Sequence, residues 1–139
     1  MSAVATATSS SPSTLHKVAE LAGRVLLSSL FLVSGLGKLS AYAATAGYMA
    51  SLGVPSALLP VVIATEVLGA LLIILGWKTR IVAFLLAGFA LLTGLIFHNN
   101  FGDQNQATHF LKNVAIAGGF LLLVVHGAGP LSLDHRGKK

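Results

Sequence analysis

The chain has 139 residues, of which 55% are hydrophobic and only 9% are charged, and its mean hydropathy is +0.84. Four acidic and nine basic residues cannot supply the surface of a soluble domain of this size. A net charge of +5 does not indicate nucleic-acid binding, because the bases stand at the ends of apolar runs. The lack of cysteine excludes disulfides, thiol redox chemistry and thiolate-held metals or clusters within this chain.

The first segment, residues 1–15, is rich in Ser, Thr and Ala and contains no charged side chain. This composition predicts a disordered tail. The first base, Lys17, directly precedes a long apolar run, whereas a secretory signal has basic residues before a shorter apolar core. We therefore expect that run to remain as a membrane helix, in one domain over residues 16–134, followed by a basic tail over 135–139.

Four apolar runs follow in chain order, and each is close to the roughly 20 residues that cross a ~30 Å hydrocarbon layer. They cover residues 18–36, 57–76, 81–97 and 110–128. The prediction is an all-α integral membrane protein, a bundle of four transmembrane helices embedded in a lipid bilayer.

The connections between the runs differ in character. Between the first two runs, Tyr42, Thr45, Met49 and Leu52 recur at helical spacing before Gly53 and Pro55 end the pattern, which predicts a short interfacial helix. The polar connection over residues 99–109 is expected to be irregular.

Basic residues set the expected orientation through the positive-inside rule. One side of the membrane holds Lys17, Lys78, Arg80, Arg136, Lys138 and Lys139, and the other side holds Lys38 and Lys112. This asymmetry predicts that both termini are cytoplasmic.

Polar residues within the runs share helix faces with small residues. Arg24 and Lys38 are 14 residues apart, which leaves them about 40° apart around a helix. The same arithmetic gives four expected inward faces: Arg24, Ser28, Phe31, Gly35 and Lys38; Glu66, Gly69, Ala70 and Ile73; Ala87, Leu91, Gly94 and His98; and Lys112, Ala115, Gly119, Leu122 and His126.

Arg24 has two candidate partners. It lies roughly 10 Å from the cytoplasmic boundary and Glu66 roughly 15 Å from it, at 1.5 Å per residue, so a long Arg side chain could span the difference. An interhelical Arg24–Glu66 pair would relieve the cost of an unpaired charge in the membrane. Alternatively, Arg24 pairs with Glu20 one turn earlier and reaches toward the headgroups.

A second polar group gathers at the outer end, where three runs begin or end. Lys38 closes the first run, His98 closes the third, and Lys112 with Asn113 opens the fourth. One interpretation is ordinary anchoring in the headgroups. The other is a mouth that binds a small anion or a quinone head and supplies a proton. Metal chemistry fits less well: His98 and His126 lie at opposite depths, and His98, Asp103 and His109 match no familiar ligand spacing.

Two pairs of segments are similar to each other. "FLVSGLGK" is similar to "ALLTGLIFH", and "EVLGALLIILG" to "IAGGFLLLVVHG". One hypothesis is therefore a parallel repeat of two hairpins. Apolar low complexity is the alternative explanation.

Together the motifs resemble the DoxX family of small bacterial membrane proteins. The segments that carry the resemblance are "LFLVSGLGKL", "GVP", "ATEVLGALLIILGWKTR", "FH", "FLKNVAIAGGFLLL" and "GAGPLSLD", and the resemblance covers nearly all of residues 18–134. The resemblance implies a four-helix protein of the bacterial inner membrane. It also places Arg24, Lys38, Glu66, His98, Lys112 and Asn113 on the family's recurrent polar positions.

Three functions are compatible with these features. Family members include a subunit of thiosulfate:quinone oxidoreductases and proteins linked to quinone or catechol detoxification and oxidative stress, which implies a redox-linked subunit that binds a quinone or small anion and works with a partner oxidoreductase. No covalently bound cofactor is expected, and whether the chain is itself an enzyme is left open. A proton-coupled carrier using Glu66, or a non-catalytic anchor for soluble partners, are the alternatives. A second copy of the chain is a further candidate partner.

Overall fold

The computed structural model describes residues 13–136, and within that range four helices are long and apolar enough to cross a membrane. In chain order the helices are α1 (Thr14–Ser40), α2 (Tyr42–Ser51), the short 3₁₀ turn η1 (Ser56–Leu58), α3 (Leu59–Leu75), α4 (Thr79–Phe97), α5 (Gln104–His126) and α6 (Leu133–Arg136). The all-helical membrane fold predicted from the sequence is confirmed. Most of the predicted N-terminal tail, residues 1–12, and residues 137–139 of the basic tail lie outside the described residues.

Two membrane helices are longer than predicted because polar residues cap them. The side chain of Ser13 accepts a hydrogen bond from the His16 amide at 3.1 Å, so α1 begins at Thr14, inside the segment expected to be a tail. The side chain of Asp103 accepts from the Asn105 amide at 2.9 Å, so α5 begins at Gln104. The prediction that residues 99–109 are irregular is therefore wrong over its second half.

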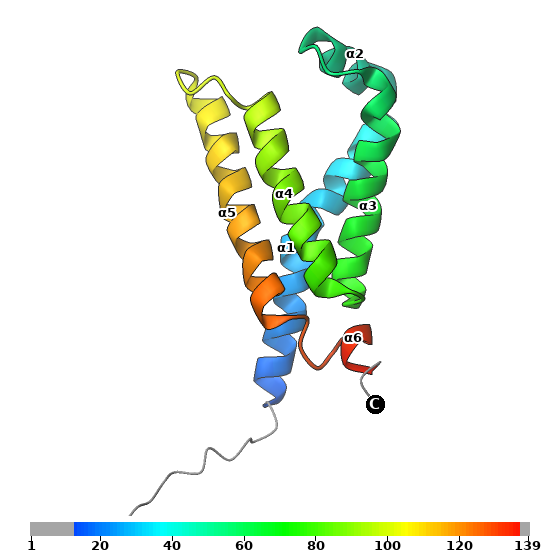
Figure 1. The fold of residues 1–139 in the computed structure, drawn as a ribbon, viewed down its shortest axis with the longest axis vertical. Coiled ribbons are helices and arrows are strands. Elements are labelled where there is room, and N and C mark those ends of the chain that lie inside the picture. The colour runs from blue at the N-terminus through cyan, green and yellow to red at the C-terminus, as the bar shows by residue number, and fades with distance from the viewer. Residues whose placement is uncertain (1–12, 137–139) are drawn as a thin grey trace, which may run out of the picture.

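The membrane helices form two hairpins, α1 with α3 and α4 with α5, which meet mainly along α3 and α4. Both hairpins begin at the same end of the bundle, where α6 also lies (Figure 1). We call this the terminal end, and the opposite end, which carries α2 and the α4–α5 connection, the distal end. Figure 1 shows the hairpins diverging toward the distal end. The shared direction is what a parallel repeat requires, and the repeat itself stays a prediction.

The predicted inward faces of α1 and α3 are confirmed. On α1 the buried residues are Arg24, Ser28, Phe31 and Gly35, and on α3 they include Glu66, Gly69, Ala70 and Ile73. On α4 the prediction is correct for Ala87 and Gly94, whereas Leu91 is exposed.

The predicted inward face of α5 is wrong. The buried residues of this helix are Ala117 and Phe120, while Lys112 and His126 are exposed. Asn113 lies on the buried side, one position away from the predicted stripe, and its amide nitrogen donates to the Ala90 carbonyl of α4 at 3.0 Å. An amide can be satisfied by a backbone carbonyl against a close helix, whereas an ammonium there would lack a counter-ion.

The predicted interfacial helix is confirmed as α2, which covers Tyr42–Ser51 at the distal end (Figure 1). Its Met49 is buried against Leu59 and Ile63 of α3, in a small cluster separate from the main core. The main core lies between the two hairpins and includes Phe31 and Phe120, whose ring centroids are 5.5 Å apart.

The C-terminal segment after α5 closes the terminal end of the bundle. The Asp134 carboxylate accepts hydrogen bonds from the backbone amides of Lys78 at 2.6 Å and Thr79 at 2.8 Å. Lys78 is the N-cap of α4 and Thr79 is its first residue, and amides at this end of a helix otherwise have no intrahelical partner. Asp134 therefore caps α4 from a distant part of the chain.

Candidate functional site

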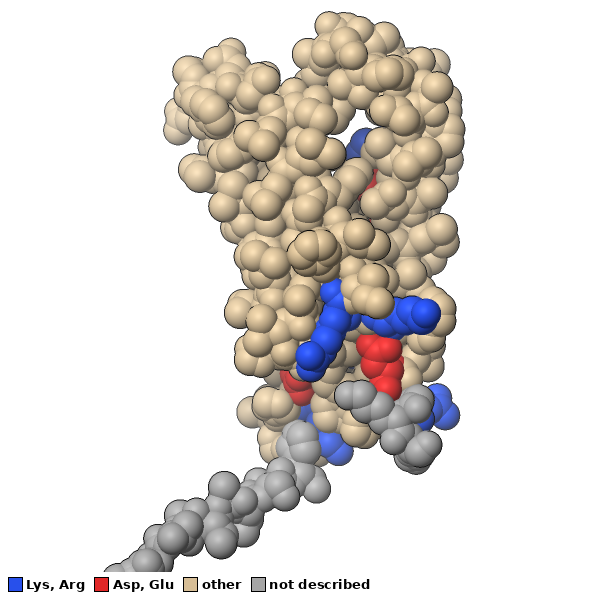
Figure 2. Space-filling model, in the orientation of Figure 1, with Lys and Arg blue, Asp and Glu red and all other residues tan. Residues whose placement is uncertain are grey.

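A cavity of about 280 Å³ lies at the distal end, where the two hairpins diverge. Figure 2 shows the molecule hollowed at this point, with basic and acidic atoms visible inside the opening when the bundle is viewed from its side. Every element of both hairpins and α2 contributes to the wall, which consists of Leu30, Phe31, Ser34, Lys38, Thr45, Tyr48, Met49, Val62, Glu66, Phe89, Thr93, Phe97, His98, His109, Lys112 and Asn113.

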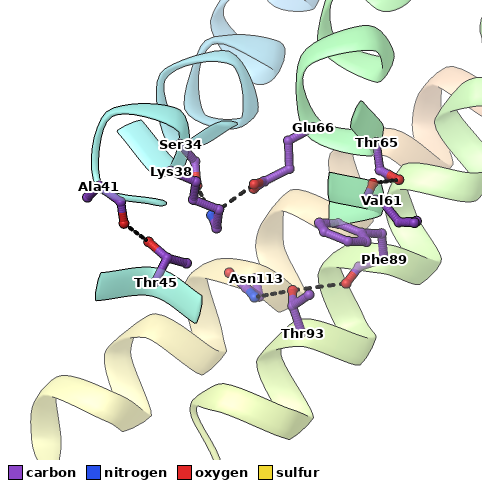
Figure 3. A network of polar contacts seen from close by, with 10 residues as sticks. All are labelled: Ser34, Lys38, Ala41, Thr45, Val61, Thr65, Glu66, Phe89, Thr93 and Asn113. Carbon is purple, nitrogen blue, oxygen red and sulfur yellow. Dashed lines mark hydrogen bonds and ion pairs between the residues drawn. The ribbon is translucent and has the colours of Figure 1, made fainter. Parts of the chain in front are cut away.

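One wall of the cavity carries a buried ion pair between α1 and α3. The Nζ atom of Lys38 lies 2.8 Å from Oε1 of Glu66 and donates to the Ser34 hydroxyl at 2.6 Å (Figure 3). The side chain of Glu66 is 6% exposed and that of Lys38 is 28% exposed, so the ammonium is the half of the pair that a ligand can reach.

A glycine brings the two helices of this pair together. A Cβ atom on Gly35 would lie 2.6 Å from Cγ2 of Val67 and 3.2 Å from Cβ of Glu66. Both distances are shorter than an ordinary van der Waals contact, so a larger side chain at this position would collide with α3. Glycine therefore permits the close approach of α1 to α3. The spacing that forms the ion pair therefore depends on Gly35.

We expect Gly35→Ala to lower the free energy of unfolding by about 1–3 kcal/mol, the range for overpacking a close contact. Thermal unfolding in detergent measures the effect. The matched control is Gly37→Ala on the same helix, because a Cβ at Gly37 meets no atom within 4 Å. Equal unfolding midpoints for the two variants would contradict the close approach.

The opposite wall of the cavity, in the second hairpin, has the same arrangement of a polar residue packed against a hydroxyl residue and a glycine. The Asn113 amide nitrogen, which donates to the Ala90 carbonyl, lies 3.3 Å from the Thr93 hydroxyl, and a Cβ on Gly94 would lie 3.2 Å from Cβ of Asn113. Figure 3 shows Asn113 and Thr93 across the cavity from Lys38 and Glu66. A hydroxyl residue followed by a glycine, packed against a polar residue of the neighbouring helix, thus occurs in both hairpins.

Two histidines and a lysine form the distal rim of the cavity. The rings of His98 and His109 stack with centroids 5.0 Å apart. Burial lowers the pKa of His98 below its usual 6.5, and the nearby His109 and Lys112 lower this pKa further. His98 and His109 do not form a metal site with Asp103, which caps α5 instead, and residues 13–136 contain no group of three or more potential ligands.

Acidification is expected to destabilise the fold through His98. Because its folded-state pKa is lowered, the unfolded chain binds the proton more tightly, so stability falls as the pH drops through 6.5 toward the lowered value. Unfolding midpoints between pH 7.5 and pH 5 measure this slope. His98→Asn should flatten the slope, and an unchanged slope in this variant would contradict the prediction.

Five of the six predicted site residues line the cavity, and the exception is Arg24. Lys38, Glu66, His98, Lys112 and Asn113 are all part of the wall. Arg24 lies toward the terminal end, where its guanidinium donates to the Ile73 carbonyl at 3.0 Å, the Ile74 carbonyl at 2.9 Å and the Leu131 carbonyl.

The predicted pair between Arg24 and Glu66 is therefore wrong, because Glu66 pairs with Lys38. The alternative local pair is not formed either. Glu20 makes its ion pair with His16 at 3.0 Å, although its charge is close enough to act on Arg24. Backbone carbonyls at the end of α3 and in the C-terminal segment satisfy the two terminal nitrogens of the guanidinium, whereas its Nε is buried without a hydrogen-bond partner among residues 13–136.

Sequence reasoning did not include the hydroxyl and aromatic residues of the wall in the candidate site, although it placed Phe31 on an inward face. Ser34 and Thr93 each precede a glycine on the inward face, and that recurrence within the two similar segments was the available signal. The aromatic residues come from three helices: Phe31 from α1, Tyr48 from α2, and Phe89 and Phe97 from α4. Nothing in their spacing distinguishes them from other apolar residues in a membrane span.

Comparison with known proteins agrees with this fold. The family model for DoxX matches residues 19–99. The chain is 45% identical to the inner membrane protein YqjF of Escherichia coli over 120 residues, which are 86% of this chain and 92% of that protein. It is 40% identical to the inner membrane protein YphA of the same organism over 123 residues, 84% of this chain and 88% of the relative. No solved structure matches significantly. The chain belongs to the DoxX family and is an inner membrane protein.

Proposed function

We propose that the chain binds the head group of a quinone in the distal cavity and acts as the membrane subunit of a partner oxidoreductase. The observation that supports this most directly is the buried Lys38–Glu66 pair in an aromatic-lined cavity of about 280 Å³. That volume is just below the roughly 300–1,000 Å³ of most small-molecule sites, which suits a single substituted ring. A quinone carbonyl can accept a hydrogen bond from the Lys38 ammonium.

A quinone fits the cavity better than a small anion does. The charge of Lys38 is already balanced by Glu66, and the lowered pKa of His98 favours its neutral form. Of the cations on the wall, Lys112 is then left for an anion, and its side chain is exposed at the rim. The rings of Phe31, Phe89 and Phe97 offer stacking surfaces for a planar head group. The opening is visible from the side of the bundle, which faces acyl chains in a membrane (Figure 2), so a lipid-soluble ligand can enter from the bilayer.

The proposed role needs a partner as the source of electrons. Reducing a quinone to a quinol takes two electrons and two protons. Lys38, Glu66 and the histidines of the rim are proton-carrying groups. The chain has no thiol that could supply the electrons, so the proposal assigns them to a partner oxidoreductase.

Calorimetric titration of the purified protein in detergent with a short-chain ubiquinone tests the proposal. We expect saturable binding to the wild type and binding at least about tenfold weaker in Lys38→Met/Glu66→Met, because one hydrogen bond is worth roughly 1.4 kcal/mol. Lys17→Met, which lies outside the cavity, is the matched control. Absent saturation in the wild type, or equal affinity in the double variant, would remove the proposal. Competition by sulfate would identify an anion site instead.

We further propose that both termini are cytoplasmic, so that the cavity lies in the periplasmic half of the membrane. Lys17, Lys78, Arg80 and Arg136 lie at the terminal end, and Lys38 and Lys112 lie toward the distal end. A green fluorescent protein fused after Lys139 should fluoresce, since this reporter does not fold after export through the general secretory route. Alkaline phosphatase fused at the same point should be inactive, and the reverse pattern would contradict this orientation.

A proton-coupled carrier is the second candidate function. The buried carboxylate of Glu66 and the two hairpins that enter in the same direction favour it. In proteoliposomes, Glu66→Gln should then abolish proton flux driven by an imposed potential. Equal flux in the variant and the wild type would exclude this role for Glu66.

A further inference from the structure

A second hollow lies at the terminal end, far from the quinone cavity along the bundle. It is a groove of about 590 Å³ between the start of α4, the end of α5 and the C-terminal segment. Figure 2 shows basic side chains beside an acidic one on this part of the surface, where α6 lies in Figure 1. The groove is at the depth where a membrane span meets the headgroup layer, because α4 begins at Thr79 and α5 ends at His126.

Basic side chains converge on this groove from three segments. Lys78 and Arg80 come from the start of α4, His126 from the end of α5, and His135 from α6. Gly127 has φ of 76°, and a Cβ there would lie 3.2 Å from Nε of Arg80. The glycine therefore lets the guanidinium lie directly against the backbone of the groove.

The acidic residue of the groove is already engaged. The Asp134 carboxylate accepts the amides of Lys78 and Thr79, so it is directed at the start of α4. The Thr79 hydroxyl, by contrast, is buried and has no hydrogen-bond partner among the described residues, although Thr79 lines the groove. A buried hydroxyl without a partner is costly unless a ligand supplies one.

An apolar surface continues from the groove along α4. Ile81 also lines the groove, and Ile81, Phe84 and Leu85 are exposed side chains on the following turn. A ligand that fills the groove with an anionic group can thus lay apolar chains against α4. Lysine, arginine and a hydroxyl donor together are the groups that bind phosphate in proteins.

We propose that this groove binds the phosphate group of an anionic phospholipid, with Lys78, Arg80 and the Thr79 hydroxyl as its ligands. The acyl chains of that lipid lie along the exposed face of α4. The assignment is independent of the quinone cavity, because the two hollows share no lining residue.

Trp77 provides a built-in reporter for the test, since it is the only tryptophan of the chain. The Nζ atom of Lys78 lies 5.0 Å from the centroid of its ring. The protein is reconstituted into phosphatidylcholine vesicles that contain a small fraction of brominated lipid, either phosphatidylglycerol or phosphatidylcholine. Brominated chains quench nearby tryptophan fluorescence, and the ratio of the two quenching constants reports selectivity for the anionic lipid next to Trp77.

For the wild type we expect a selectivity ratio of about fivefold or more, the scale of one added basic contact with anionic lipid. The ratio should approach one in Lys78→Gln/Arg80→Gln and fall partway in Thr79→Val, which removes only the hydroxyl. Lys17→Gln, a basic residue at the same end but outside the groove, should keep the wild-type ratio. A wild-type ratio near one, or equal loss in Lys17→Gln, would overturn the proposal.

Inorganic phosphate distinguishes the two sources of the same chemical group. At constant ionic strength, replacing chloride by phosphate should leave the selectivity ratio unchanged if a lipid occupies the groove. Loss of the ratio under phosphate would assign the groove to the free ion and overturn the lipid assignment. Circular dichroism of each vesicle sample shows whether a variant is folded, so that loss of quenching in an unfolded variant is not counted.

Discussion

Lys38→Met is expected to lower the free energy of unfolding by about 3–5 kcal/mol, the range for removing one partner of a buried ion pair. The variant leaves the Glu66 carboxylate, whose side chain is 6% exposed, without its counter-ion. Glu66→Met should cost less, because the remaining Lys38 ammonium is 28% exposed and reaches the cavity. Unfolding by increasing sodium dodecyl sulfate in mixed micelles measures both variants.

The double variant Lys38→Met/Glu66→Met separates the interaction energy of the pair from the energies that each side chain has with the rest of the protein. Removing both charges together leaves no uncompensated charge, so most of the stability lost in Lys38→Met should return. If the stability loss of the double variant instead equals the sum of the losses of the two single variants, the two side chains do not interact. That result would also leave the quinone proposal without its central observation.

The second large effect is expected for Arg24→Met. Arg24 is 1% exposed, and its guanidinium donates to carbonyls of α3 and of the C-terminal segment. Methionine fills similar space but donates nothing, so we expect a loss of at least ~3 kcal/mol, because each buried acceptor left without a donor costs about 1–3 kcal/mol. Hydrogen exchange of residues 131–136 should rise as well, because the segment loses its attachment to α1.

Lys17→Met is the control for this prediction, as it removes a basic residue from the same helix without touching α3. Its unfolding curve and its exchange rates over residues 131–136 should match those of the wild type. If Arg24→Met lowers stability and leaves exchange of that segment unchanged, the bond to the Leu131 carbonyl does not hold the segment in place.

The four spans and α2 could be predicted from the sequence because they depend on local properties. Apolar length identifies a membrane helix directly. The spacing of Tyr42, Thr45 and Met49 was enough to identify α2. The starts of α1 and α5 were predicted too late, because Ser13 and Asp103 cap helices whose first turns are polar. Hydropathy does not detect a polar first turn.

Partners between helices were harder to predict, and the wrong Arg24–Glu66 pair has a geometric cause. Depth along the membrane was estimated from Cα positions, but helix side chains lean toward the N-terminus of their own helix. On α1 that direction is the terminal end, so Arg24 leans away from Glu66 and Lys38 leans toward it. Five of six site residues nevertheless share one cavity, because charge in a bundle is buried between helices wherever its neighbours are small.

The bond between Arg24 and the Leu131 carbonyl spans 107 positions of the chain. A ribosome adds Leu131 long after Arg24, so the nascent first hairpin must exist for a time without this acceptor. The terminal end can reach its final state only after α5 has left the translocon, because Leu131 follows this helix. A stop codon in place of Pro130 would therefore yield four complete spans that lack the Leu131 acceptor, and the terminal end would stay open.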